Sequence, residues 1–119
     1  MLMADEERNN KELENSKDIV LANALWVKSD ALVSNAEYAE AVKGYKLAKT
    51  IFENIYGSNI KYMINLSYLY NKGAKAAIHL PKKEDRVIWC SYFLKPLVIF
   101  FGKDHVHTLE ITKLCEELK

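Results

Sequence analysis

The sequence is poor in the residues that make tight turns, with four glycines and two prolines among 119 residues. An all-β sandwich or barrel joins many short strands by turns rich in these two residues. Their scarcity argues against such a fold and favours long helices. Half of the residues are hydrophobic and 28% are charged, so the chain has enough apolar material for a folded core.

The sequence also has few cysteines and a small net charge. The two cysteines, Cys90 and Cys115, lie in apolar helical segments, which predicts no disulfide framework and favours a reducing compartment, the cytoplasm or the nucleus. The formal net charge is +1, and so weak a field predicts no nucleic-acid partner. Residues 1–17 contain no apolar run, so no signal peptide is expected.

Long hydrophobic runs are limited to VIWCSYFLKPLVIFF, residues 87–101. A membrane-spanning helix needs roughly 20 apolar residues, and Lys95-Pro96 interrupts this shorter run. We therefore expect no membrane partner. A run that is apolar on every face is typical of a helix buried on all sides.

Motifs of catalysis, cofactor binding and metal binding are missing. There is no glycine-rich phosphate loop and no Gly-x-Ser-x-Gly turn. His105 and His107 are two residues apart, so on a helix they point away from each other, and no Cys-x-x-Cys pair accompanies them. Cys90, between Trp89 and Ser91, has the surroundings of an inert packing thiol. We expect a non-enzymatic protein without cofactor or metal.

Apolar spacing and breaker residues predict an all-α fold of about five helices. Residues 1–17 are interpreted as a polar helical extension, and residues 18–119 as one helical domain. We expect Ser16 and Asp104 as helix caps, Gly57 and Gly102 as left-handed helix ends, and a kink or stop near Pro96. The expected helices of the domain are 18–34, 37–56, 60–77, 82–101 and 105–118.

One expected helix carries a stripe that alternates large and small side chains: Tyr38, Ala41, Tyr45, Ala48, Phe52 and Ile55. The steps of three and four residues place them on one helix face. We expect Ala41 and Ala48 to let neighbouring helices approach closely while the aromatic rings fill the flanking grooves. Ser29 on the preceding helix and Ser67 on the following one are small enough for such contacts.

The chain also repeats itself. Gly57 and Gly102 lie 45 residues apart, and each follows an aromatic residue at a hydrophobic helix end and precedes two polar residues and a new helix. A period in this range indicates stacked helix pairs, each of which needs a neighbour to cover its apolar face. The sequence thus predicts antiparallel helix hairpins stacked side by side.

These patterns resemble the tetratricopeptide repeat. The segment before Gly57 resembles the second helix of a repeat, through Tyr38, Ala41, Tyr45, Ala48, Ile51 and Tyr56. The following segment resembles the first helix of the next repeat, through Asn65, Leu66, Ser67 and Tyr70. The turn 101–105, Phe-Gly-Lys-Asp-His, resembles both the longer repeats of kinesin light chains and the C-terminal helical arm of SET-MYND lysine methyltransferases.

The resemblance covers roughly residues 20–118 and implies two repeats plus a terminal helix. In the second repeat the alanine positions hold Arg86 and Phe93, so we expect the second helix pair to pack differently. In this family the first helices of successive repeats line a concave groove that binds a peptide. The implied groove residues are Asn23, Trp26, Asp30, Lys61, Asn65, Tyr68 and Lys72.

The resemblance favours a protein-interaction adaptor or scaffold that binds a peptide or a partner helix. It argues against the family's carboxylate clamp for chaperone tails, because Trp26 and Asp30 replace two clamp positions and only Asn65 matches. The arm of a SET-MYND-type methyltransferase and a structural subunit of a larger complex stay open as alternatives, as does a homo-oligomer.

A second interface is also predicted on the run 87–101, because two repeats offer too little surface to bury it. We expect some of its large side chains to contact a second protein: Trp89, Phe93, Val98 and Phe101.

Overall fold

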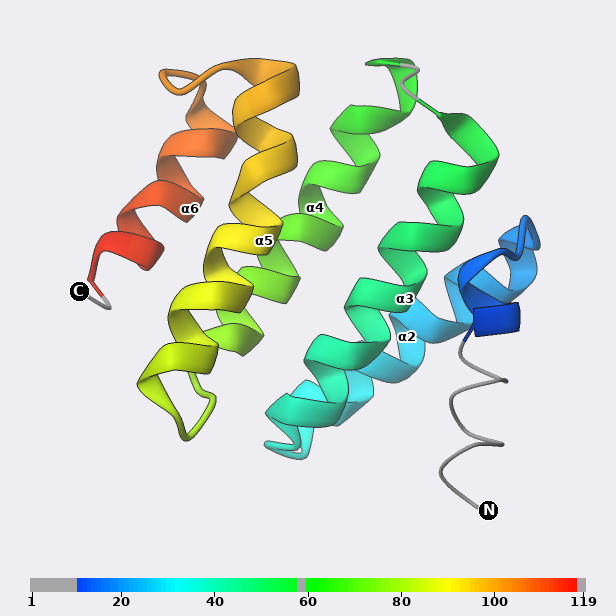
Figure 1. Cartoon of the computed structure of the whole chain (residues 1–119), viewed down its shortest axis with the longest axis horizontal. Helices are drawn as coiled ribbons and strands as arrows, with labels where there is room; N and C mark the ends of the chain where they lie inside the picture. Colours follow the sequence, from blue (N-terminus) through cyan, green and yellow to red (C-terminus); the bar gives the residue numbers. More distant parts are fainter. Residues whose placement is uncertain (1–10, 58–59, 118–119) are drawn as a thin grey trace.

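A computed structural model describes residues 11–57 and 60–117, without the side chains of residues 60–63 (Figure 1). From residue 19 to residue 117, five helices follow one another in the described ranges: α2 (Ile19–Ser34), α3 (Tyr38–Tyr56), α4 (Ile60–Ala77), α5 (Lys83–Phe101) and α6 (Val106–Glu116). Within these described ranges there is no β-strand. The predicted all-α fold is confirmed.

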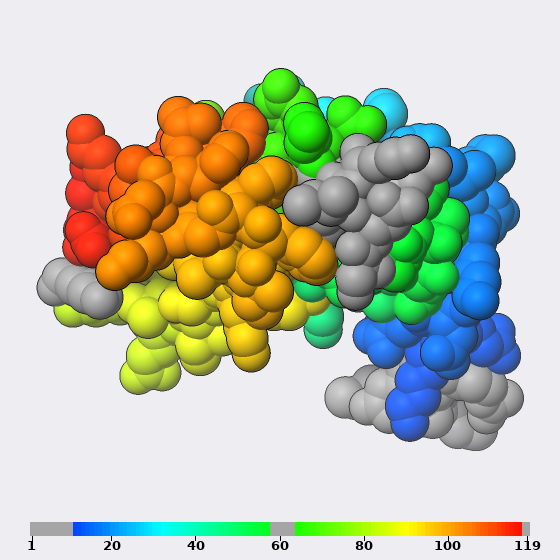
Figure 2. Space-filling model, turned by 90° about the horizontal axis from the view of Figure 1, so that it is seen from above, coloured from blue at the N-terminus to red at the C-terminus, as the bar shows by residue number. Residues whose placement is uncertain are grey.

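The helices form two layers. Each helix packs against the next one in the chain in antiparallel fashion, and α4 also packs against α6. As a result α3 and α5 lie in one layer and α2, α4 and α6 lie in the other. Figure 2 looks along the helices and shows part of α5 at its lower edge and parts of α2 and α4 at its upper edge. The shortest dimension, 23 Å, matches two helix diameters of about 10–12 Å each.

The helix starts differ from the predicted caps. The Asp18 carboxylate, not Ser16, caps α2, because its Oδ1 accepts hydrogen bonds from the backbone N–H groups of Val20 and Leu21. The Ser16 hydroxyl instead accepts from the Asp18 N–H. At α6 the cap is His105, not Asp104. Sequence offers several polar residues near each start, and only the backbone path decides which one faces the free N–H groups.

The helix ends follow the prediction more closely. Gly57 ends α3 and Gly102 ends α5, both with positive φ (59° and 84°), a conformation open mainly to glycine. Their N–H groups donate to equivalent carbonyls, those of Glu53 and Val98. Pro96 does not stop α5, which continues to Phe101. The loss of one backbone hydrogen bond at Pro96 is outweighed by the burial of flanking side chains such as Phe93 and Leu97.

The first hairpin is closed by small residues. The predicted stripe on α3 is confirmed: Tyr45, Ala41, Ala48 and Phe52 are buried, and the two end members are partly buried. The two helices approach each other closely at Gly44, a residue the sequence pattern did not single out. A Cβ atom at Gly44 would overlap the Ser29 hydroxyl. Ser29 is buried and its hydroxyl donates to the Leu25 carbonyl, so the small residue on α2 is where it was expected.

The second hairpin does pack differently. The close contact lies between Gly73 of α4 and the ring of Phe93 of α5, where a Cβ at Gly73 would come within 2.5 Å of the ring. The small residue thus sits on the first helix of this pair and the large one on the second. Phe93 is fully buried inside the chain. Within this chain its side chain is therefore not exposed to the predicted second interface.

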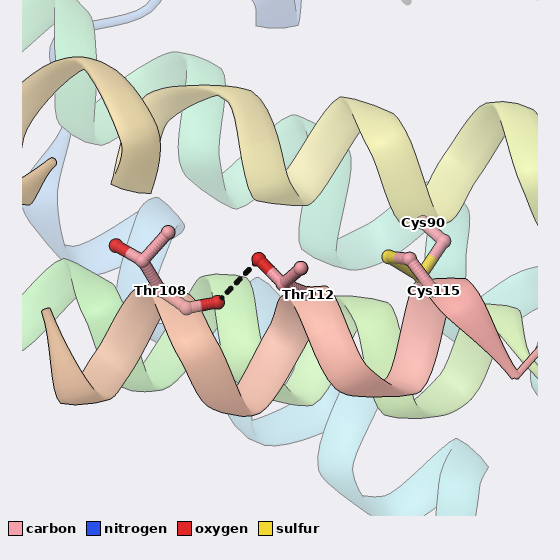
Figure 3. Close-up of a disulfide and its surroundings, with 4 residues drawn as sticks. All are labelled: Cys90, Thr108, Thr112 and Cys115. Carbon is pink, nitrogen blue, oxygen red and sulfur yellow. Dashed lines mark hydrogen bonds between the residues drawn. A yellow bond between two sulfur atoms is a disulfide. The ribbon is translucent and has the colours of Figure 1, made fainter. Parts of the chain in front are cut away.

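Cys90 of α5 and Cys115 of α6 form a disulfide (Figure 3), with their Cα atoms 5.6 Å apart. The prediction that these thiols stay unpaired is wrong, because the α5–α6 turn brings residues 25 positions apart together. The expectation of a reducing compartment loses this support, since disulfides persist mainly in oxidising surroundings. On the same helix pair the Thr108 hydroxyl donates to the Leu97 carbonyl at 3.2 Å.

The described part of the N-terminal extension is anchored to α3. Residues 11–14 are helical, and the Asn54 side chain donates to the carbonyls of Glu14 and Ser16 at 2.7 and 3.1 Å. The rest of this predicted extension, residues 1–10, lies outside the described residues. None of the helices in the described ranges has the length and hydrophobicity that a membrane crossing requires.

Candidate functional site

Asp30 of α2 ties three helices together. Its Oδ1 accepts a hydrogen bond from the Tyr45 hydroxyl of α3 at 2.5 Å, and its Oδ2 accepts one from the Lys72 ammonium of α4 at 3.1 Å. Tyr45 is buried, whereas the two charged side chains reach the surface. An ion pair so exposed contributes at most about 1 kcal/mol. Its clearer consequence is structural, because it fixes the position of α2 along α4.

Other predicted groove residues lie at helical spacing from this ion pair on α2 and α4. The helices α2 and α4 run in the same direction, so residues one turn before Asp30 and Lys72 lie at matching heights. These are Trp26 on α2 and Tyr68 on α4. Two turns before the ion pair, Asn23 and Asn65 correspond in the same way.

The last helix, α6, contacts α4 through its side chains. The ring of Tyr68 lies 6.3 Å from the ring of His107 on α6, in edge-on orientation. Further toward the C-terminal ends of the two helices, Lys75 of α4 forms an ion pair with Glu110 of α6 at 3.2 Å. A hydrogen bond from Asn71, followed by the hydrogen bond and the charge of Lys75, lowers the pKa of the Glu110 carboxyl. Side-chain contacts thus link α2 to α4 and α4 to α6 along one surface of this layer.

We call this surface the α2/α4/α6 face and define it by its side chains that reach solvent: Asn23, Asn65, Tyr68, Lys72 and His107. Tyr68 is the largest of them, with 57% of its area exposed. Trp26 is partly buried and packs edge-on against Phe52 at 5.9 Å between ring centres. Asp30 is engaged within the chain as described. Lys61 lies in the first turn of α4, and its side chain is outside the described residues.

The residues predicted for the second interface do not gather on one surface. Trp89 is partly buried, with the Lys46 ammonium 5.6 Å from its ring centre. Phe101 is partly buried and stacks on His105 at 4.6 Å. Val98 is exposed to 41%. With Phe93 in the core, α5 has two faces, one buried and one exposed, rather than being buried on all sides.

Sequence reasoning missed a charged cluster between α3 and α5. Lys49 is only 7% exposed. Its ammonium forms an ion pair with Glu53 at 2.6 Å, donates to the Tyr92 hydroxyl at 3.5 Å and lies 4.6 Å from the centre of the Tyr92 ring. The Tyr70 ring is 5.8 Å away on the inner side. A signal existed in the sequence: Lys49 is four residues after Tyr45 and three before Phe52, inside the apolar stripe.

Between the described helices the surface is hollowed, and two of the hollows stand out. The first, about 880 Å³, lies between α2 and α3, with Leu25, Leu32 and Leu47 among its apolar lining and Trp89 at one side. The second, about 490 Å³, lies between α3 and α5 and is lined by the Lys49 cluster together with Lys95, Pro96, Ile99 and Phe100. Both volumes are in the range of small-molecule sites.

Two buried tyrosines titrate abnormally. Burial, reinforced by the Asp30 carboxylate, raises the pKa of Tyr45 far above its ordinary value of about 10. Burial, reinforced by the negative charge of Glu53, raises the pKa of Tyr70 in the same direction. The Tyr70 hydroxyl makes no hydrogen bond with the described residues. Both tyrosines hold their protons in the folded chain at pH values where an unfolded chain releases them.

We therefore expect the free energy of unfolding to fall as the pH rises above about 10, because the unfolded chain then loses tyrosine protons that the folded chain keeps. The contribution is fully present at neutral pH. Urea unfolding at pH 8 and pH 11 measures the fall in the free energy of unfolding between the two pH values. In a Tyr45→Phe, Tyr70→Phe double variant this fall should be much smaller. An equal fall in the double variant would contradict this account. Tyr70→Phe alone should be neutral or stabilising at pH 8, since it removes an unpaired buried hydroxyl.

Comparison of the chain with known protein families, curated proteins and solved structures finds no match. Within the described ranges, no group of three or more His, Cys, Asp or Glu side chains is arranged to hold a metal ion.

Proposed function

We propose that this chain is a non-enzymatic protein-interaction module of the tetratricopeptide type, which binds a peptide segment of another protein on the α2/α4/α6 face. The observation that carries the proposal is a pair of side-chain contacts that link these helices. The Asp30–Lys72 ion pair joins α2 to α4 and the Tyr68–His107 ring contact joins α4 to α6, so the exposed amide, aromatic and charged groups belong to helices of one layer.

The chemistry of the face suits a peptide. Tyr68 is an exposed aromatic anchor, the residue type that contributes most at interfaces relative to its entropic cost. Asn23 and Asn65 each offer amide donors and acceptors to a peptide backbone. Lys72 is half-exposed beside Asp30, so it keeps N–H groups for an acidic side chain of the partner.

Selection from a displayed library of random peptides, followed by affinity measurement, tests the proposal. We expect Tyr68→Ala to weaken a selected peptide by about 5- to 30-fold, the effect of losing 1–2 kcal/mol at a central aromatic contact. Chemical shift changes in the labelled protein should map to α2, α4 and α6.

The matched control is Ile88→Ala, which removes a comparably exposed apolar side chain (62%) from α5, outside the face. It should leave peptide affinity unchanged. The proposal is wrong if Ile88→Ala weakens binding as much as Tyr68→Ala, or if selected peptides shift only the α3 and α5 resonances.

A second candidate function, that of a structural subunit, is favoured by the exposed apolar side chains of α5. Ile88 and Val98 are 62% and 41% exposed on one helix. If the chain is such a subunit, a partner protein should co-purify with it in fixed stoichiometry, and Ile88→Ala should weaken the binding of that partner. For peptide binding on the α2/α4/α6 face, Ile88→Ala is expected to have no effect.

A further inference from the structure

The second hollow, between α3 and α5, places charged groups beside an apolar wall. Lys49 is nine-tenths buried and lines the hollow together with Glu53 and Tyr92. Its other side is apolar, formed by Pro96, Ile99 and Phe100. A concave site with an apolar wall and a few convergent polar groups has the general composition of a small-molecule site.

The charges of the hollow favour an anion. Lys49 and Lys95 contribute two positive charges, and Glu53 contributes one negative charge. The Glu53 carboxylate is already engaged by Lys49 at 2.6 Å, so it is poorly placed to hold a second cation. Lys95 is exposed and forms no ion pair with any residue in the described ranges. An incoming anion therefore finds an unpaired ammonium, whereas an incoming cation meets two positive charges.

The donors of the hollow also suit a carboxylate. An ammonium group has three N–H donors, and Lys49 directs two of them to Glu53 and the Tyr92 hydroxyl, which leaves one. The Tyr92 hydroxyl can donate as well as accept. Because Lys49 is held by an ion pair and by the Tyr92 ring, its donor is ordered before any ligand arrives.

We propose that this hollow binds a small organic carboxylate with a flat apolar body. The carboxylate lies between the Lys95 ammonium and the Lys49–Tyr92 pair, and the apolar body covers Pro96 and Phe100. The site is in the α3/α5 layer, on the other side of the molecule from the α2/α4/α6 face. It does not depend on peptide binding, so either proposal can fail alone.

Protein-observed NMR titration with 1-naphthoate tests the site, and 1-naphthalenemethanol is the neutral probe of nearly the same shape. We expect naphthoate to shift resonances in the second half of α3 and in α5 between Tyr92 and Phe100. It should bind about fivefold more tightly than the alcohol, as one partly exposed ion pair provides. Equal affinity of the two probes would mean that the hollow is only an apolar crevice and would overturn the proposal.

Variants assign the charge contribution. Lys95→Gln should remove most of the preference for naphthoate without affecting the fold, since this side chain is exposed. Lys103→Gln, which removes an exposed lysine outside the hollow, is the control and should leave the preference intact. An unchanged preference in Lys95→Gln, shifts scattered over the surface, or no shifts at millimolar probe would each refute the site.

Discussion

Reduction of the Cys90–Cys115 disulfide is expected to lower the free energy of unfolding by about 3.5 kcal/mol, the chain-entropy value for a closed loop of about 25 residues. The unfolded chain gains the conformational freedom that the cross-link denied it, while the folded chain keeps its contacts. Urea unfolding of the oxidised and the reduced wild-type protein, followed by tryptophan fluorescence, measures the difference on a single sequence.

The control is a Cys90→Ala, Cys115→Ala variant, whose unfolding should not respond to the reductant. Thiol titration verifies that the wild-type bond is open. If fully reduced and oxidised protein unfold at the same urea concentration, the cross-link does not constrain the unfolded chain as described.

The location of the disulfide predicts which helix loses stability first when the bond is reduced. Among the described helices, α6 makes its main contacts with α5 and α4. Without the bond it keeps Ile111 in the core, the Thr108 hydrogen bond to Leu97 and the ion pair of Glu110. We expect amide hydrogen exchange in reduced protein to accelerate most in α6. Uniform acceleration over all helices would show that α6 does not open separately.

Phe93→Ala is expected to destabilise the fold by about 3–5 kcal/mol, because it leaves a cavity in the α4–α5 contact. Phe93 is fully buried, and its ring lies against the backbone of Gly73. Gly73→Ala is expected to destabilise too, by about 1–3 kcal/mol of overpacking, reduced by the better helix propensity of alanine. Urea unfolding midpoints, analysed with the same dependence of the free energy of unfolding on urea concentration, measure both destabilisations.

The double variant separates packing from other causes. In Gly73→Ala, Phe93→Leu the added methyl group occupies space that the ring has left. The double variant should therefore cost less than the sum of its two single variants, because the residues touch. Strict additivity would mean that the two side chains do not share this space. A Phe93 variant that folds stably but loses a protein partner would instead support the interface role predicted from sequence.

The helices themselves were readable from sequence. The steps of three and four along Tyr38, Ala41 and Tyr45 predicted a buried face, and the two glycine ends recur 45 residues apart with positive φ. These features are local: periodicity, backbone freedom and turn chemistry act within a few residues. The cap of α2 was misassigned because Ser16 and Asp18 are both suitable and only two residues apart, so only the backbone geometry distinguishes them.

The candidate sites were readable only in part. Periodicity places Asn65, Tyr68 and Lys72 on one face of one helix, but it does not say which residues of α2 stand beside them. The pairing of Lys72 with Asp30 depends on the distance between α2 and α3, which the small residues Ser29 and Gly44 set. The Lys49 cluster depends on Tyr92 and Tyr70, which reach it from two other helices.

Sequence by itself determined the helical class, the helix ends at Gly57 and Gly102, and the small-residue stripe, because these follow from forces between near neighbours along the chain. Tertiary structure alone decided three things: the disulfide, the burial of Phe93 against Gly73, and the charged hollow between α3 and α5. Each of these joins residues of different helices, and their distance depends on packing contacts accumulated over the whole stack.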